Sequence, residues 1–196
     1  ELSDKIKLNT LENIHSNVEG DAVRIIQELR KENYFYIFED ESRSKLLSYV
    51  GHQFTRNKYF RERFVEAFAS SAQQKSLAGK NWWIISIVLG VNIGYSLARS
   101  FHLKRTVMLI NKTGIDFVTS DNPVINVMDN NSAVTGKPPE RVDFYFPVSP
   151  NLAYMINDSD SYGEGLVDAT EEMAIFLNTK MLQKSHQTIF GNSREI

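Results

Sequence analysis

The apolar pattern of this chain changes near His102, and this change constrains the fold more than any other feature of the sequence. Before it, apolar residues recur at three- and four-residue steps, as they do over residues 11–29, which is the period of an amphipathic helix. After it, short apolar runs alternate with turn residues, beginning with residues 106–110. We therefore predict an α+β fold, with helices first and then a small, mostly antiparallel sheet closed by a C-terminal helix.

The length of 196 residues suits one domain with a sizeable core. We predict a single domain over residues 1–196, with a helical half at 1–101 and the sheet plus C-terminal helix at 102–196. The chain begins with Glu1 and shows no signal peptide, which indicates a fragment of a longer protein.

The helical half is predicted to hold two to three long helices. The first covers residues 11–29, and a second helical stretch covers residues 42–76, which Ser42 or Ser44 could cap.

The most apolar segment of the chain covers residues 82–98. It is shorter than the about twenty apolar residues that a membrane span needs, and polar and small residues interrupt it. We expect a buried central helix and no membrane association, with a membrane or interfacial helix as the alternative. Gly90 and Gly94 would let another backbone approach closely.

The second half is predicted to begin with a hairpin, in which strand 106–110 and strand 115–119 flank a turn at 111–114. The remaining expected elements are an extended piece at 124–127, a polar loop at 129–140, strands at 142–148 and 152–156, a loop at 158–165, a helix at 169–184 capped by Asp168 or Thr170, and a short strand at 187–190.

Composition and charge exclude several classes of function. The net charge of −2 and the pI near 6.1 give no overall attraction for nucleic acid, although a local basic patch would be compatible with them. The absence of cysteine excludes disulfides, thiolate zinc sites and cysteine nucleophiles. It is compatible with a soluble cytoplasmic protein, which is what we expect here. We also expect the protein to bind no cofactor.

Four phrases, in order along the chain, resemble one protein family. They are the acidic helix at 11–14, the Gln-Phe-Thr-Arg step at 53–56, the FVTSDNPV segment at 117–124 and the FPVSP segment at 146–150. Asn178 fits the family's last motif. The chain resembles the bacterial domain-of-unknown-function family numbered 4238, whose members usually carry an upstream segment that these residues lack. The resemblance implies a protein of bacteria and their mobile elements, and it implies no particular biochemistry.

The most specific phrase, residues 119–123, predicts a rigid corner after a strand. Asp121 or Asn122 can bond the backbone two residues on, and Pro123 keeps Asn122 out of the helical region. A structural turn is the favoured interpretation. The alternative is a site in which Asp121 is catalytic and Ser120 and Asn122 bind a ligand.

Glu12 and Arg56 are the other catalytic candidates, and Gln53 is a third candidate for ligand binding. Gln53 lies one turn before Arg56 on the same predicted helix. The simpler interpretation is an interhelical ion pair; the alternative is an Arg/Gln anion pocket near Asp121.

Motifs of several enzyme classes are absent from the sequence. It has no Walker phosphate loop, GxGxxG, HExxH or GxSxG, and no lysine has an acid two residues before it, as many metal-dependent nucleases require. The four histidines lack ligand spacing, so we predict no metal site; they are His15, His52, His102 and His186.

Two hypotheses of function follow from these observations. The first is a binding or regulatory module whose helical half docks a protein partner or the missing N-terminal segment, with aromatic anchors at residues 34–38 and 82–83. The second is a hydrolase or nucleic-acid-processing enzyme of a bacterial conflict system, with its site near Asp121. Convergence of Asp121, Arg56 and Glu12 in one pocket would favour the enzyme. The sequence is compatible with both hypotheses, so it assigns the chain neither as an enzyme nor as a non-enzyme.

Overall fold

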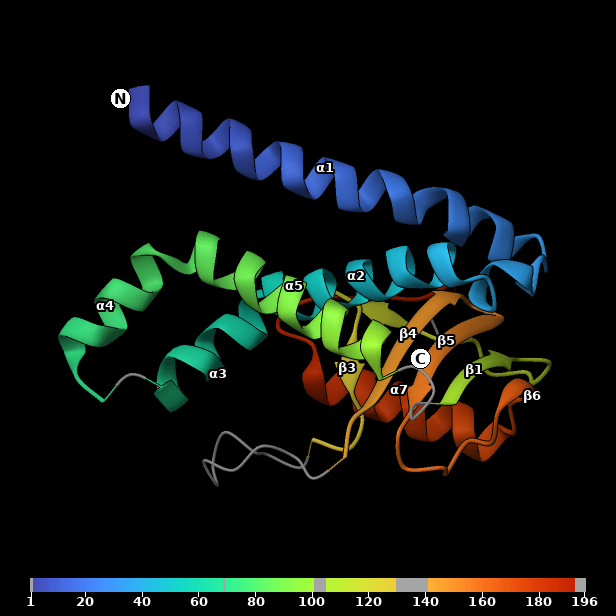
Figure 1. Ribbon diagram of the computed structural model, residues 1–196. Helices are drawn as coiled ribbons and strands as arrows, with labels where there is room; N and C mark the ends of the chain where they lie inside the picture. Colours follow the sequence, from blue (N-terminus) through green and yellow to red (C-terminus); the bar gives the residue numbers. More distant parts are fainter. Residues whose placement is uncertain (1, 69, 101–104, 130–140, 193–196) are drawn as a thin grey trace.

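The computed structural model describes residues 2–68, 70–100, 105–129 and 141–192, and of residues 2–11, 68 and 105 it describes the backbone alone. Helices form the first part of the chain, and a mixed sheet with one helix against it forms the second (Figure 1). The predicted α+β class and the order of its parts are therefore confirmed.

The helical part contains one long helix and four shorter ones. The elements are α1 (Leu2–Arg30), a 3₁₀ turn (Tyr34–Ile37), α2 (Asp40–Arg56), α3 (Lys58–Phe68), α4 (Ala72–Lys80) and α5 (Trp82–Arg99).

The single helical stretch predicted at 42–76 was wrong, because three helices lie there. Asn57 separates α2 from α3, because its backbone is extended (φ −77°, ψ 160°). Its side-chain oxygen accepts a hydrogen bond from Phe60 N (2.7 Å) and so satisfies a free amide of the first turn of α3. The predicted cap of α2 was also wrong, because Glu39 accepts from Ser42 N in the place of a serine hydroxyl.

Helices α2 and α5 cross at backbone contact through three glycines, Gly51, Gly90 and Gly94, which we call the glycine seam. A Cβ atom on Gly51 would lie 2.5 Å from the carbonyl oxygen of Gly90, and one on Gly94 would lie 2.8 Å from Ser48 Cα. Only glycine allows two helices to approach this closely. The close approach expected at Gly90 and Gly94 is confirmed.

The main sheet has the strand order β3-β4-β5-β1-β6. Its strands are β1 (Arg105–Ile110), β3 (Ile125–Asn126), β4 (Asp143–Ser149), β5 (Leu152–Asn157) and β6 (Gly165–Asp168). The pairs are antiparallel except for β1 with β6, which is parallel. The hairpin of β4 and β5 was predicted, whereas β6 was not.

The predicted hairpin at 106–119 was wrong. Both edges of β1 are already paired, with β5 on one side and β6 on the other. Asn111 instead turns the chain toward the β4–β5 turn, since its side-chain amide donates to Ile115 O (2.7 Å) and Pro150 O (3.2 Å). Strand β2 (Thr119–Ser120) then pairs with β7 (Ile189–Phe190) in a second, two-stranded sheet.

The main sheet is packed on both faces (Figure 1). One face packs against α1, α2 and α5, and the other packs against α7 (Glu171–Lys184). The side chains of β4 alternate between the two faces. Phe144 and Phe146 pack on the side of α1, α2 and α5, and Tyr145 packs on the side of α7. Helix α7 is capped by Thr170, one of the two predicted caps, whose hydroxyl accepts from Met173 N (3.2 Å).

Candidate functional site

Asp121 lies at the tip of the corner formed by residues 119–123, and its carboxylate is used to hold the chain that follows α7. One carboxylate oxygen accepts from His186 N (2.9 Å) and the other accepts from Gln187 N (2.8 Å). The amide of Asp121 itself donates to Thr188 O (3.1 Å). Both oxygens of the first catalytic candidate are therefore committed to backbone hydrogen bonds.

The electrostatics of Asp121 agree with this structural use. Burial alone would raise the pKa of its carboxyl, but backbone hydrogen bonds at His186, Gln187 and Thr188 outweigh burial and hold the pKa below its ordinary value. A general acid or base that works near neutral pH needs a carboxyl pKa shifted in the opposite direction.

Ser120 and Asn122 are buried, and their polar atoms are satisfied inside the protein. The Ser120 hydroxyl accepts from Asn122 N (3.0 Å). The Asn122 side chain accepts from Asn57 Nδ2 (2.7 Å) and donates to Lys184 O (3.1 Å). The corner therefore ties the junction of α2 and α3 to the end of α7, which supports the structural interpretation of both ligand-binding candidates.

Arg56 and Glu12 lie elsewhere. Arg56 forms its ion pair with Glu19 of α1, two helical turns from Glu12. Glu12 and Arg56 both line an open groove between α1, α2 and α5, and Asp121 is not among the residues that line it. Gln53 is buried, in contrast to the exposed Arg56. The convergence of Asp121, Arg56 and Glu12 that would favour an enzyme is therefore not observed.

Two histidines meet beside this groove. His15 lines it, and its ring lies edge-on to the ring of the buried His52, with 6.4 Å between the centroids. His52 Nδ1 lies 2.8 Å from Ser48 O, but His52 Nε2 and His15 Nδ1 are buried without a partner in the described part of the chain. Burial, Arg56 and His52 lower the pKa of His15, against a weaker opposite effect of Glu19. Among the described residues no three His, Asp or Glu side chains are placed to hold a metal.

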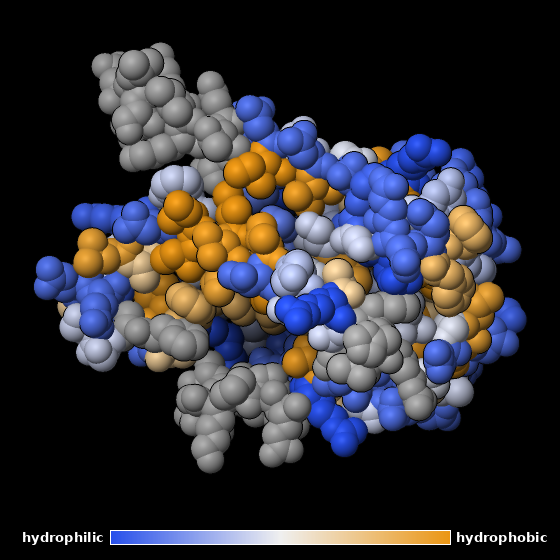
Figure 2. All heavy atoms as spheres, in the orientation of Figure 1, coloured by the Kyte–Doolittle hydropathy of each residue, from blue (hydrophilic) through white to orange (hydrophobic). Residues whose placement is uncertain are grey.

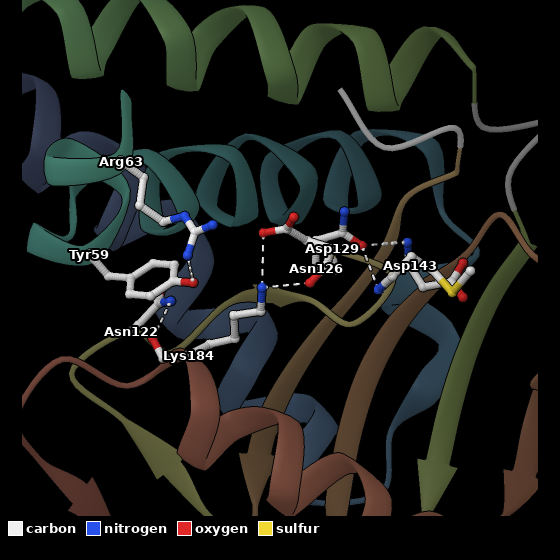
Figure 3. Close-up of polar contacts among 8 residues, drawn as sticks. Tyr59, Arg63, Asn122, Asn126, Asp129, Asp143 and Lys184 are labelled. Atoms are coloured by element: carbon white, nitrogen blue, oxygen red, sulfur yellow. Dashed lines mark hydrogen bonds and ion pairs between the residues drawn. The ribbon is translucent and has the colours of Figure 1, made fainter. Parts of the chain in front are cut away.

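A buried lysine lies next to the corner and was missed by the sequence analysis. Lys184, in the last turn of α7, donates to the carboxylate (2.9 Å) and to the backbone carbonyl (2.7 Å) of Asp129 (Figure 3). Its ammonium group also faces the ring of Tyr59, 5.9 Å from the centroid. On the same ring, the guanidinium of Arg63 lies 5.1 Å from the centroid and donates to the Tyr59 hydroxyl (2.7 Å). No sequence signal joins residues 55 positions apart, such as Asp129 and Lys184.

This cluster joins elements of the fold together. The ammonium of Lys184 is neutralised by Asp129, and its contact with the Tyr59 ring joins the end of α7 to α3, where Arg63 holds the same ring. Together with Asp121 and Asn122, these contacts explain why the corner carries so many polar residues.

The exposed face of α5 is the main feature that internal contacts leave unexplained. Four of its large apolar side chains are between 44 and 65% exposed, namely Ile84, Val88, Val91 and Tyr95, which we call the α5 strip. Their spacing of four, three and four residues places them along one side of the helix, away from the glycine seam. Figure 2 shows hydrophobic atoms gathered over the middle of this face, where α5 crosses in Figure 1.

The burial expected for this segment is therefore only half right. Ser86, Gly90, Gly94 and Leu97 are buried, but the opposite face is open in the described structure. Within the described residues α5 is the one helix whose length and composition would allow it to cross a membrane. An exposed apolar strip of this kind marks an interaction surface more often than a plain protein surface.

Comparison with known proteins identifies the family. A family model described as "Protein of unknown function (DUF4238)" matches residues 93–195, just over half of the 196 residues. The chain belongs to this family. Neither a curated protein nor a solved structure gives a significant match.

The matched DUF4238 segment starts within α5 and includes the corner, the main sheet and α7. Two of the four phrases that suggested the family, at 117–124 and 146–150, lie inside it, as does Asn178. Asn178 has a clear structural use, because its side chain accepts from Val118 N (3.0 Å) and donates to Asp116 O (2.8 Å). It fastens the segment that leads into the corner onto α7. The phrases at 11–14 and 53–56 lie outside the matched residues.

Proposed function

We propose that this DUF4238 chain is a binding module without catalytic activity of its own, and that the α5 strip is its docking surface. The strip carries the proposal: it is a continuous apolar face on a helix that the rest of the fold holds rigidly through the glycine seam. Rigid presentation favours binding, because little conformational entropy is lost when a partner docks.

The enzyme hypothesis is the second candidate, and the geometry favours it less. Its three catalytic candidates do not share a pocket, and the carboxylate of Asp121 is occupied by backbone amides. Under this hypothesis the groove beside Arg56 is a place for a small ligand, since His15 and His52 each have one buried nitrogen nearby without a partner among the described residues.

A cellular assay with matched variants separates the two functions. In the full-length protein, the double variant V88E/V91E changes two exposed side chains, so we expect an unchanged melting temperature and loss of the protein's cellular phenotype. The control is I175E/F176E, which changes two exposed apolar residues on α7 and should keep the phenotype.

The enzyme hypothesis predicts a different pattern. Under it, V88E/V91E keeps the phenotype, whereas H15A/R56A in the groove abolishes it at an unchanged expression level. That pattern would contradict the proposed docking function.

A further inference from the structure

We infer that the α5 strip docks this protein onto an anionic lipid surface, with α5 lying in the plane of the surface. The inference rests on the proposed function, because it names the partner of the same face. The exposed apolar residues alone would fit several partners, and the distribution of charge around them selects this one.

The strip has the shape that a lipid surface requires. Ile84 and Tyr95 are eleven residues apart, so the strip is about 16 Å long at the helical rise of about 1.5 Å per residue. No charged residue occurs between Lys80 and Arg99, and the other exposed side chains of α5 between them are neutral. The aliphatic part ends at Tyr95, an aromatic residue of the kind that favours the boundary between lipid and water.

Along the sequence, the charges on either side of the strip are all of one sign. Six of the 22 basic residues and none of the 24 acidic residues occur in residues 67–115, which leaves 16 basic against 24 acidic residues in the rest of the chain. Lys80 and Arg99, both exposed, lie at the two ends of the strip. An acidic protein therefore presents its main apolar helix within a purely basic segment, and basic residues beside an apolar face attract anionic lipid headgroups.

A second copy of the chain fits this surface poorly. If two α5 strips paired in antiparallel fashion, Arg99 of each copy would approach Lys80 of the other. In a parallel pair, like residues would meet at both ends. No acidic residue of the segment is available to compensate either arrangement.

Docking in the plane fits the fold better than spanning. The far side of α5 is in backbone contact with α2 through the glycine seam, and α2 packs on the main sheet. A spanning helix would have to break this packing, whereas a surface-bound helix uses only the face that is already exposed.

Vesicle co-sedimentation of the full-length protein tests the inference. We expect binding to vesicles of phosphatidylcholine with phosphatidylglycerol to be about tenfold tighter than to phosphatidylcholine alone, and to weaken at high salt. The V88E/V91E variant should bind at least about tenfold more weakly, because it places two carboxylates in the strip. The K80Q/R99Q variant should lose the preference for phosphatidylglycerol, and I175E/F176E should bind as the wild type does.

Three outcomes would overturn the inference. They are no binding to phosphatidylglycerol vesicles, equal binding by V88E/V91E and wild type at equal melting temperature, and a dimer in solution that V88E/V91E dissociates. Crosslinking in cells from a photoreactive residue at position 88 distinguishes a failure of the lipid inference from a failure of the proposed docking function. A protein adduct would overturn the lipid partner and leave α5 as a docking surface, whereas the absence of any adduct, with the cellular phenotype intact in V88E/V91E, would contradict both.

Discussion

The side-chain amides of Asn57 and Asn122 are joined by a buried 2.7 Å hydrogen bond, although 65 residues separate them in the sequence. Asn57 lies where α2 ends and α3 begins, and Asn122 lies in the corner after β2. Through this bond the helical part is fixed to the most specific phrase of the DUF4238 segment. The corner is therefore a joint between the two parts of the fold.

We expect Asn57→Ala and Asn122→Ala each to lower the free energy of unfolding by about 2 kcal/mol, because each leaves a buried amide without its partner. Both variants remove the same bond. The double variant should therefore lose about 1 kcal/mol less free energy of unfolding than the sum of the two single losses. Urea unfolding of the four proteins measures this coupling. Strictly additive losses would show that the bond does not stabilise the joint.

Asp121 should contribute stability that depends on pH. Its pKa in the folded protein is below the ordinary value of 3.8. Its stabilising effect is thus present in full above that value and is lost as the pH falls through the folded-state pKa. Asp121→Asn has a single side-chain acceptor for the two amides of His186 and Gln187, so its melting temperature should be lower than that of the wild type at pH 7.

The difference in melting temperature between wild type and Asp121→Asn should shrink below about pH 4, because the wild-type carboxyl then takes up a proton. Thermal unfolding of both proteins from pH 7 to about pH 3 provides the measurement. A difference that stays constant over this range would mean that ionised Asp121 does not hold the end of α7.

The sequence predicts those elements whose local pattern and tertiary contacts agree. In β4 and β5 the apolar side chains are buried on both faces, and the Ser149-Pro150-Asn151 turn between them forces a hairpin, so both strands were predicted closely. The residues after Asn111 have a similar apolar pattern, but β1 has no free edge for them. Which strands occupy an edge is decided by distant parts of the chain, so that error could not be avoided from the local pattern.

The candidate site was likewise predictable only in the part that depends on local sequence. Asp121 and Asn122 belong to a phrase that resembles the family, and the local sequence correctly predicted a polar corner there. Its partners could not be predicted, because Asn57, Lys184 and the amides of His186 and Gln187 meet it only through the tertiary fold. The open face of α5 was likewise hidden, since hydropathy shows how apolar a helix is and not which side is covered.

The glycine seam gives a prediction with an internal control. Gly51→Ala should destabilise the protein by about 3 kcal/mol or more, because its methyl group would lie 2.5 Å from Gly90 O and 2.8 Å from Gly94 N, both backbone atoms. Gly20→Ala, in the exposed part of α1, meets no described atom within 4 Å and should stabilise by about 0.5–1 kcal/mol through helix propensity. Equal effects in chemical denaturation would contradict the close packing of α2 and α5.

Two lysine–aspartate pairs provide the last prediction, since they differ in burial. Lys184 is 7% exposed and donates two hydrogen bonds to Asp129, whereas the Lys112–Asp168 pair lies in solvent, with both side chains more than 60% exposed. Lys184→Met should therefore cost about 2 kcal/mol, because it leaves buried acceptors without these donors. Lys112→Met should change stability by less than about 0.5 kcal/mol, because water screens the exposed pair. Urea denaturation at matched pH and salt compares the two variants. Similar losses of stability would show that Lys184 does not hold α7 to the segment that contains Asp129.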